Sequence, residues 1–262
     1  MAAAALHRIQ ELNNYATVKV ESRPLNDLNG NYFDQFNVIL LSDYVQEAEA
    51  LRINNFVRNR CLFTHLYMNL LFWSYVCLII IFFSSDRANP AVSFWSGVFG
   101  TEGWFISDFG DKFKYKPDNT ANANGDIQDI KFNSFESILK RPWDSIVSKH
   151  HPLSITYVKS RILSKFRDSN SHRNPELQDI DAMTEIKDHL LKANNCDTSL
   201  VSNEQIHNLC GHSTYAPIMI CSILGSFLSN EVIKAVSLSG KPELNIFVFS
   251  SDDYIVKVFP VI

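Results

Sequence analysis

Asp43 is the residue whose position is most like that of a ligand-binding side chain. It follows the compact apolar run Phe36–Leu41, which is typical of a parallel strand buried on both faces. Open α/β sheets bind ligands at the carboxyl ends of such strands. An Asp in front of a helix also caps it, by accepting hydrogen bonds from free backbone N–H groups. Because a helix is predicted after Asp43, we interpret it first as a helix cap, and keep it as a weak candidate for cofactor binding.

The glycines are a second place to look for chemistry, because nucleotide-binding α/β proteins hold phosphate groups on a glycine-rich turn that opens a helix. Neither GxGxxG nor GxxxxGK occurs in the sequence. Gly97, Gly100 and Gly103 come closest, but their spacing differs and no helical pattern follows them. We interpret these glycines as a backbone turn, and we expect this chain to bind no cofactor of its own.

The five cysteines are scattered and include no CxxC pair, which argues against a zinc cluster. Their odd number and loose spacing fit a reducing compartment better than a disulfide framework. A nucleophilic thiol needs a basic neighbour or a helix N-terminus to lower its pKa. Cys210 has His212 two positions away, but closeness in sequence seldom positions a base. We therefore predict no catalytic residue and no metal site in this chain.

Three further groups have simpler structural interpretations. Cys221 lies inside an apolar stretch predicted to be helical, where a thiol packs as a small apolar group. The pair His150-His151 lacks identifiable partners for a metal site, so a solvent-exposed loop is the better interpretation. The pair Asp252-Asp253 lies between two alternating apolar runs and is predicted to form a hairpin turn.

Composition is that of an ordinary globular protein. The 262 residues are 46% hydrophobic, which is enough for one sizeable core, and the net charge of −4 gives no indication of nucleic-acid binding. The N-terminal MAAAALHRIQEL lacks the basic start and the long apolar run of a signal peptide. It is typical of the middle of an Ala-rich helix, so we expect further sequence upstream.

The elements predicted in the first half of the chain form part of a doubly wound α/β layer. Apolar periodicity predicts helix, strand, strand and helix, at 2–13, 18–20, 36–41 and 45–60. Further apolar runs predict strands at 92–95 and 103–109, with a short partner at 112–115. The polar segment 116–126 is predicted to be a surface loop.

The second half of the chain is predicted to be mainly helical. Its periodicity predicts helices near 151–168, 176–194 and 202–210. Pro217 opens a longer helix over 218–237, since Pro is favoured in the first turn of a helix. The runs 245–249 and 254–258 alternate like the two strands of a closing hairpin.

The segment Leu62–Phe83 does not fit a globular α/β protein. It carries no formal charge over 22 positions, which is about the length that crosses a bilayer. By hydropathy alone, a membrane-spanning helix and a soluble alternative are equally favoured.

Three stretches together resemble the pseudo-adenylation half of the activating enzymes for ubiquitin-like modifiers, a ThiF-type family. Ile9–Val20 is similar to the family's helix-then-strand segment. Phe36–Asp43, with Leu51–Asn54, is similar to the next strand and helix. The third is the most specific, with an AP helix start, an EVIKA helix end and an aromatic strand, at Tyr215–Ile218, Glu231–Val236 and Asn245–Phe249. Val98–Phe105 is a weaker fourth match.

The resemblance implies an α/β fold with an incomplete Rossmann-like (ThiF-type) layer, a helical insertion, and a C-terminal helix plus β-hairpin. It divides the chain into a partial α/β layer at 1–130, a helical segment at 131–214, and a C-terminal helix and hairpin at 215–262 that belong again to the adenylation fold. The short insertion is closer to the smaller subunit of SUMO-activating enzymes than to the regulatory subunit of the neddylation activating enzyme. A single-chain ubiquitin-activating enzyme would continue beyond the last hairpin.

The function that the resemblance implies is that of a regulatory subunit in a heterodimer. Such a subunit supports the ATP-dependent activation of SUMO in protein sumoylation, in the nucleus and also in the cytoplasm. The larger catalytic subunit, its partner, holds the ATP, the Mg²⁺ and the catalytic cysteine. In this family the smaller subunit contributes an arginine from its N-terminal region, which reaches toward the partner's nucleotide. The segment with that arginine is expected upstream of these residues, so no catalytic residue is carried over. Asp43 aligns with a metal- or nucleotide-associated Asp of active relatives.

Other interpretations stay open beside this one. The chain could be the regulatory subunit of the neddylation activating enzyme, a fragment of a ubiquitin-activating enzyme, a non-functional or scaffold isoform, or a membrane-anchored α/β protein. In the family, the helix ending near Arg60 runs quickly into the next strand, so 61–90 is a surplus apolar insertion. We favour translated intron sequence or an alternative transcript over a membrane segment, because a spanning helix would separate two halves of one sheet.

Overall fold

The computed structural model describes residues 6–7, 9–11, 15, 18–59, 68–73, 76–81, 91–117, 127–143, 153–243, 245–251 and 255–259. The chain divides into two compact units. Unit 1 comprises Met1–Trp95, Ser107–Phe135 and Ser229–Glu243, and unit 2 comprises Ser96–Ile106, Glu136–Leu228 and Leu244–Ile262. Each unit combines strands and helices, so the predicted α/β class is confirmed.

Unit 1 is built on a mixed sheet with the strand order β1-β3-β4-β2-β5. These strands are β1 (Val18–Val20), β2 (Val38–Ser42), β3 (Met68–Trp73), β4 (Val76–Ile81) and β5 (Val92–Phe99), and β5 continues into unit 2. β1 is parallel to β3, whereas β4 is antiparallel to both β3 and β2. The side chains of Val38–Leu41 are all buried, as the compact apolar run predicts.

Part of the apolar segment Leu62–Phe83 lies in this sheet. β3 pairs with β4 from Asn69 opposite Ile80 to Trp73 opposite Val76. A membrane-spanning helix, which hydropathy alone favoured as much as a soluble structure, is therefore wrong for these two strands. Hydropathy measures how apolar a segment is, whereas the β-branched residues of β4 favour an extended backbone. The intron origin of 61–90 stays a prediction.

A buried polar network fixes helix α3 (Glu47–Arg58) within unit 1. Asn54 is fully buried, and its Nδ2 donates to Ser93 Oγ at 2.8 Å and to Asp108 Oδ2 at 2.7 Å. Its Oδ1 accepts a hydrogen bond from the backbone N–H of Phe135 at 3.1 Å. Burial raises the pKa of the Asp108 carboxyl, and the Arg58 guanidinium, 2.6 Å away, opposes this rise. All the hydrogen-bonding groups of the Asn54 amide are satisfied, so the amide specifies how α3 packs.

Two short strands of unit 1 correct the prediction for 112–115. β7 (Phe113–Tyr115) pairs antiparallel with β8 (Gln128–Ile130), and not with the strand that precedes it in sequence. The ring of Phe109 lies 4.8 Å from that of Phe113 and 4.7 Å from that of Phe132. This aromatic packing joins the ends of the β7–β8 pair to the core of unit 1.

Unit 2 combines a sheet of strand order β5-β6-β9-β10 with a set of helices. Its strands after β5 are β6 (Glu102–Asp108, mostly in this unit), β9 (Ile246–Ser250) and β10 (Ile255–Phe259). β9 is antiparallel to both β6 and β10, as the predicted hairpin requires. The helices are α4 (Phe135–Lys140), α6 (Ile155–Ser169), α7 (Ile180–Ala193), α8 (Asn203–His212) and the first part of α9 (Ile218–Ser237).

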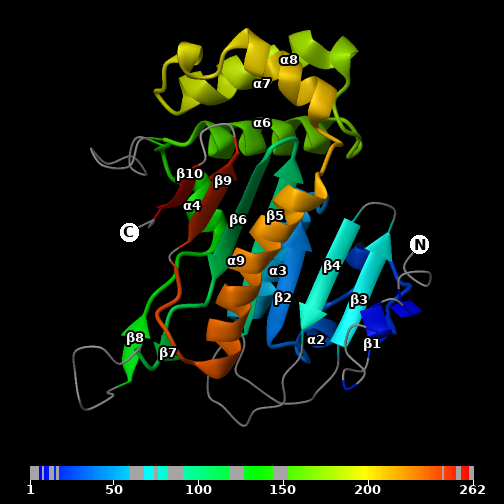
Figure 1. Cartoon of the computed structure of the whole chain (residues 1–262), viewed down its shortest axis with the longest axis vertical. Coiled ribbons are helices and arrows are strands. Elements are labelled where there is room, and N and C mark those ends of the chain that lie inside the picture. The colour runs from blue at the N-terminus through cyan, green and yellow to red at the C-terminus, as the bar shows by residue number, and fades with distance from the viewer. Residues whose placement is uncertain are drawn as a thin grey trace. The chain divides into compact units, whose positions relative to one another are not determined.

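Aromatic rings form the contact between the sheet and the first part of α9. The ring of Phe247 in β9 stacks on Phe105 of β6 at 4.6 Å and lies 4.8 Å from Phe227 of α9. Helices α6, α7 and α8 pack one on the next (Figure 1). The predicted bounds of α9 are confirmed, and so are the positions of α6, α7 and α8.

Candidate functional site

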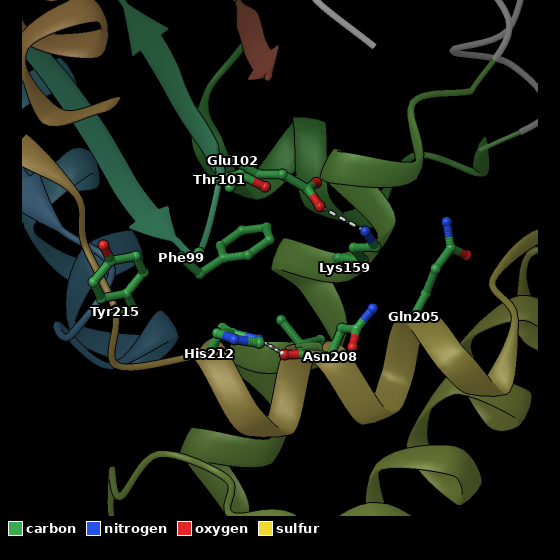
Figure 2. A pocket seen from close by; sticks show the side chains of 10 residues that line it. Phe99, Thr101, Glu102, Lys159, Gln205, Asn208, His212 and Tyr215 are labelled. Carbon is green, nitrogen blue, oxygen red and sulfur yellow. Dashed lines mark hydrogen bonds and ion pairs between the residues drawn. The ribbon is translucent and has the colours of Figure 1, made fainter. Parts of the chain in front are cut away.

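A cavity of about 400 Å³ in unit 2 is the candidate site. Side chains from the β5–β6 turn, from α6, and from α8 and the segment after it surround the space (Figure 2). A volume near 400 Å³ lies at the smaller end of the range for ligand pockets. The lining residues are Phe99, Gly100, Thr101, Glu102, Lys159, Gln205, Asn208, Leu209, His212 and Tyr215.

The backbone of Gly100 ties one wall of the cavity to the other. Gly100 has a φ of +54°, a conformation that side chains disfavour, and it forms the turn between β5 and β6. Its N–H donates to the carbonyl oxygen of Tyr215 at 2.7 Å and lies 3.2 Å from that of His212. The turn is therefore held against the end of α8.

Helix α8 supplies the polar wall. Ser202 caps it in a capping box with Gln205, because the Ser202 hydroxyl accepts from the N–H of Gln205 while the Gln205 side chain accepts from the N–H of Ser202. Gln205, Asn208 and His212 follow at spacings of three and four, so they share one face of the helix. The Nδ1 of His212 lies 3.0 Å from the carbonyl oxygen of Asn208.

A buried ion pair lies at the cavity wall formed by β6 and α6. The Nζ of Lys159 is 2.5 Å from Glu102 Oε1, and their side chains are 10% and 7% exposed. The second carboxylate oxygen, Glu102 Oε2, is buried and has no hydrogen-bond partner among the described residues. A buried acceptor without a donor carries a desolvation cost that needs an explanation.

Asp43 does not have the position predicted for it. It is buried in a turn that follows β2, and the N-cap of α3 is Gln46. The N–H of Val45 donates to the Ser42 carbonyl at 3.0 Å, so the chain makes a turn before the helix begins. The cap interpretation is therefore wrong, and a ligand role for Asp43 stays untested.

The interpretation of the three glycines as a backbone turn is confirmed for Gly100 alone. Gly97 lies within β5, Gly100 in the turn and Gly103 within β6, and this turn leads into a strand and not a helix. A Cβ on Gly103 would lie 3.4 Å from the side chain of Leu224. This distance is an ordinary van der Waals contact, so Leu224 of α9 packs directly over this position of the sheet.

Two of the described cysteines, Cys210 and Cys221, lie in environments that do not activate a thiol. Cys210 is buried, and burial raises the pKa of its thiol, with the Asp179 carboxylate adding to the rise. Cys221 is exposed on α9, so our interpretation of it as core packing is wrong. Partial burial raises the pKa of the Cys221 thiol as well. Within the described ranges, no three His, Cys, Asp or Glu side chains gather as metal ligands. His150-His151 and Asp252-Asp253 lie outside them.

Sequence reasoning missed the Glu102–Lys159 pair. The two residues are 57 positions apart, and neither belongs to a motif. A signal did exist in β6, where Glu102 begins a strand whose residues are otherwise almost all apolar or small. A charged residue in such a strand indicates a buried partner.

Helix α9 is a second feature with functional meaning. It is the one helix in the described part of the chain that is long and apolar enough to cross a membrane, with a mean hydropathy of 1.4. A helix of this length and apolar composition can span a membrane, but it can also bind another protein. Only 28% of its apolar window is buried, and Ile218 and Met219 are 85% and 66% exposed. An apolar surface of this kind marks an interaction site.

Comparison with known proteins identifies related sequences, although no family model matches. The chain is 32% identical over 127 residues to "SUMO-activating enzyme subunit 1A" of Arabidopsis thaliana, which covers 48% of this chain and 38% of that protein. It is 23% identical over 250 residues to "SUMO-activating enzyme subunit 1B-1" of the same plant, covering 94% and 66%. With "SUMO-activating enzyme subunit 1" of Danio rerio the identity is 22% over 276 residues, covering 95% and 69%. The matches therefore span less than two thirds of the first two relatives.

Proposed function

We propose that this chain is a non-catalytic subunit of a SUMO-activating enzyme, which supports ATP-dependent activation of a SUMO-like modifier by a larger catalytic partner. The proposal rests on relatives that carry the name SUMO-activating enzyme subunit 1 and align with almost the whole chain. The partner supplies the ATP, the Mg²⁺ and the catalytic cysteine. The nucleus, and also the cytoplasm, is the proposed place of action.

The exposed face of α9 is the observation that best supports a partner-dependent role. Tyr215, Ile218 and Met219 are 58%, 85% and 66% exposed, close together in sequence at the start of the helix. Ser222 and Gly225 follow on the exposed side, and their small size allows another backbone to approach closely. Aromatic and Met side chains are enriched in protein–protein interfaces. We assign this face to the contact with the larger subunit.

Binding to the partner is tested with two matched variants. Nothing lies within 4 Å of a Cβ placed on Gly225, so Gly225→Arg puts a long charged side chain on the face without a clash inside the chain. Ala182→Arg adds the same charge to an exposed position of α7. We expect Gly225→Arg to weaken association with the larger subunit at least tenfold in sedimentation experiments, and Ala182→Arg to leave it unchanged. Equal affinities for both variants would exclude α9 as the contact.

Activity is tested separately from binding, by ATP–pyrophosphate exchange in the presence of SUMO. We expect no exchange with the purified chain alone and exchange when the larger subunit is added. Exchange by the chain alone would contradict a non-catalytic role. Association without exchange would identify a scaffold, and failure to associate would refute the proposed function.

A further inference from the structure

We propose that the cavity in unit 2 is a binding site for a neutral carboxamide group. The inference concerns the residues between the β5–β6 turn, α6 and α8, and it does not depend on the proposed role in SUMO activation. It starts from Glu102, a charged side chain that is 7% exposed and lines the cavity.

Within the described ranges, only one of the two carboxylate oxygens of Glu102 accepts a hydrogen bond. Its Oε1 accepts from Lys159 Nζ at 2.5 Å, while Oε2 has no partner among the residues that the structure describes. A carboxylate turns readily about its last torsion angle, because that torsion is broad. Because Oε2 itself is buried, the carboxylate must turn about this torsion for Oε2 to meet a donor in the cavity. The ammonium of Lys159 has three N–H donors, and the structure gives it one hydrogen bond.

The ion pair therefore presents an acceptor and a donor side by side. A carboxamide presents the complementary arrangement, with an N–H group for Glu102 and a carbonyl oxygen for Lys159. A carboxylate ligand would place a negative charge beside Glu102, and an amine would add a second cation beside Lys159. Because Glu102 and Lys159 neutralise each other, the site favours a ligand that is polar but uncharged.

The other walls fit the same ligand. Gln205 and Asn208 are carboxamides themselves and lie on one face of α8. The Gln205 oxygen already accepts from the N–H of Ser202, so the amino group of Gln205 and the amide of Asn208 are the groups that can meet a ligand. Phe99 and Tyr215 add aromatic side chains to the lining of the cavity (Figure 2). A cavity of about 400 Å³ holds either a small aromatic amide or an Asn or Gln side chain of a docked polypeptide.

The test uses benzamide and benzoate, which have the same shape and differ in charge and in the N–H donors. Binding to the full chain is measured by ligand-observed and protein-observed NMR. We expect benzamide to bind at least tenfold more tightly than benzoate, with shifts at Gln205 and Asn208. A second arm compares acetyl-Ala-Gln-Ala-N-methylamide with its Glu counterpart. Binding of the Gln peptide indicates a polypeptide source for the amide, and binding of benzamide alone indicates a small molecule.

Variants decide whether the binding occurs in this cavity. Glu102→Leu combined with Lys159→Met removes both charges together, and we expect it to reduce benzamide binding at least tenfold. Asn208→Ala changes an exposed residue, so it keeps the chain folded and should weaken binding at least threefold. His207→Ala, at an exposed position of α8 that does not line the cavity, is the control. Equal binding of benzamide and benzoate, no binding of any amide, or unchanged binding to Asn208→Ala would overturn the proposal.

Discussion

Replacing Asn54 with Leu tests whether the buried polar network holds unit 1 together. Leu branches at the same carbon as Asn but cannot donate or accept hydrogen bonds. The substitution leaves the N–H of Phe135, the Oγ of Ser93 and the Oδ2 of Asp108 without the Asn54 amide, and all three lie in the interior. Each buried group that loses its partner costs about 1–3 kcal/mol, so the three together cost about 3–9 kcal/mol. The higher helix propensity of Leu recovers about 0.5 kcal/mol of this.

We therefore expect Asn54→Leu to lower the free energy of unfolding by at least about 3 kcal/mol, a large share of the stability of a typical domain. Urea denaturation followed by circular dichroism measures this change, and hydrogen exchange at the Phe135 amide reports on the network itself. Asn55→Leu is the control, because Asn55 is exposed on the same helix and surface substitutions usually change stability by about 0.5 kcal/mol or less. The reasoning fails if both variants unfold at the same urea concentration and the Phe135 amide keeps its protection.

Two further predictions concern the backbone and the charges of unit 2. Gly100→Ala should destabilise the chain by about 1–2 kcal/mol in thermal denaturation, because its φ of +54° disfavours a side chain, whereas Gly225→Ala in α9 should stabilise it by up to about 1 kcal/mol. Arg173 lowers the pKa of the Asp179 carboxyl to about 2, so the ion pair stabilises the fold above about pH 4 and this contribution is lost as the pH falls toward 2. In an NMR titration, Arg173→Gln should return that pKa toward its ordinary value of 3.8, and an unchanged pKa would exclude Arg173 as the cause.

The elements that sequence predicted well are those with a clear local signal. Helix α9 begins after Pro217, and the strands β9 and β10 alternate on either side of a polar turn, so both follow from neighbouring residues alone. The pairing of β7 was missed because its partner β8 lies after a polar segment and not next to it in sequence. The strands β3 and β4 were not predicted within Leu62–Phe83 because a uniformly apolar run has no periodicity to distinguish a helix from a strand.

The candidate site could not be predicted because folding assembles it from distant residues. Glu102 and Lys159 lie on different elements, and only tertiary packing brings the two side chains to 2.5 Å. Asp43 was misassigned because the turn of the chain at Ser42 delays the start of α3 to Glu47. Cys221 was misassigned for a related reason: α9 is apolar over most of its surface, so its sequence does not indicate which side faces the protein.

The proposed protein partner accounts for the apolar character of α9 better than a membrane does. In unit 1, Glu231 lies near the C-terminal end of α9 and is 3% exposed. The Nζ of Lys234 lies 2.6 Å from the Glu231 carboxylate. The other carboxylate oxygen accepts from the backbone N–H of Glu243 at 2.9 Å. In this network the charge of Glu231 is paired with groups of the folded chain, whereas charged side chains inside a bilayer are costly. In unit 2, a Cβ placed on Gly103 of the sheet would lie 3.4 Å from the Leu224 side chain, whereas a Cβ placed on Gly225 would meet nothing within 4 Å. One side of α9 thus packs against the rest of this chain, and the small exposed residues on the other side fit a second polypeptide.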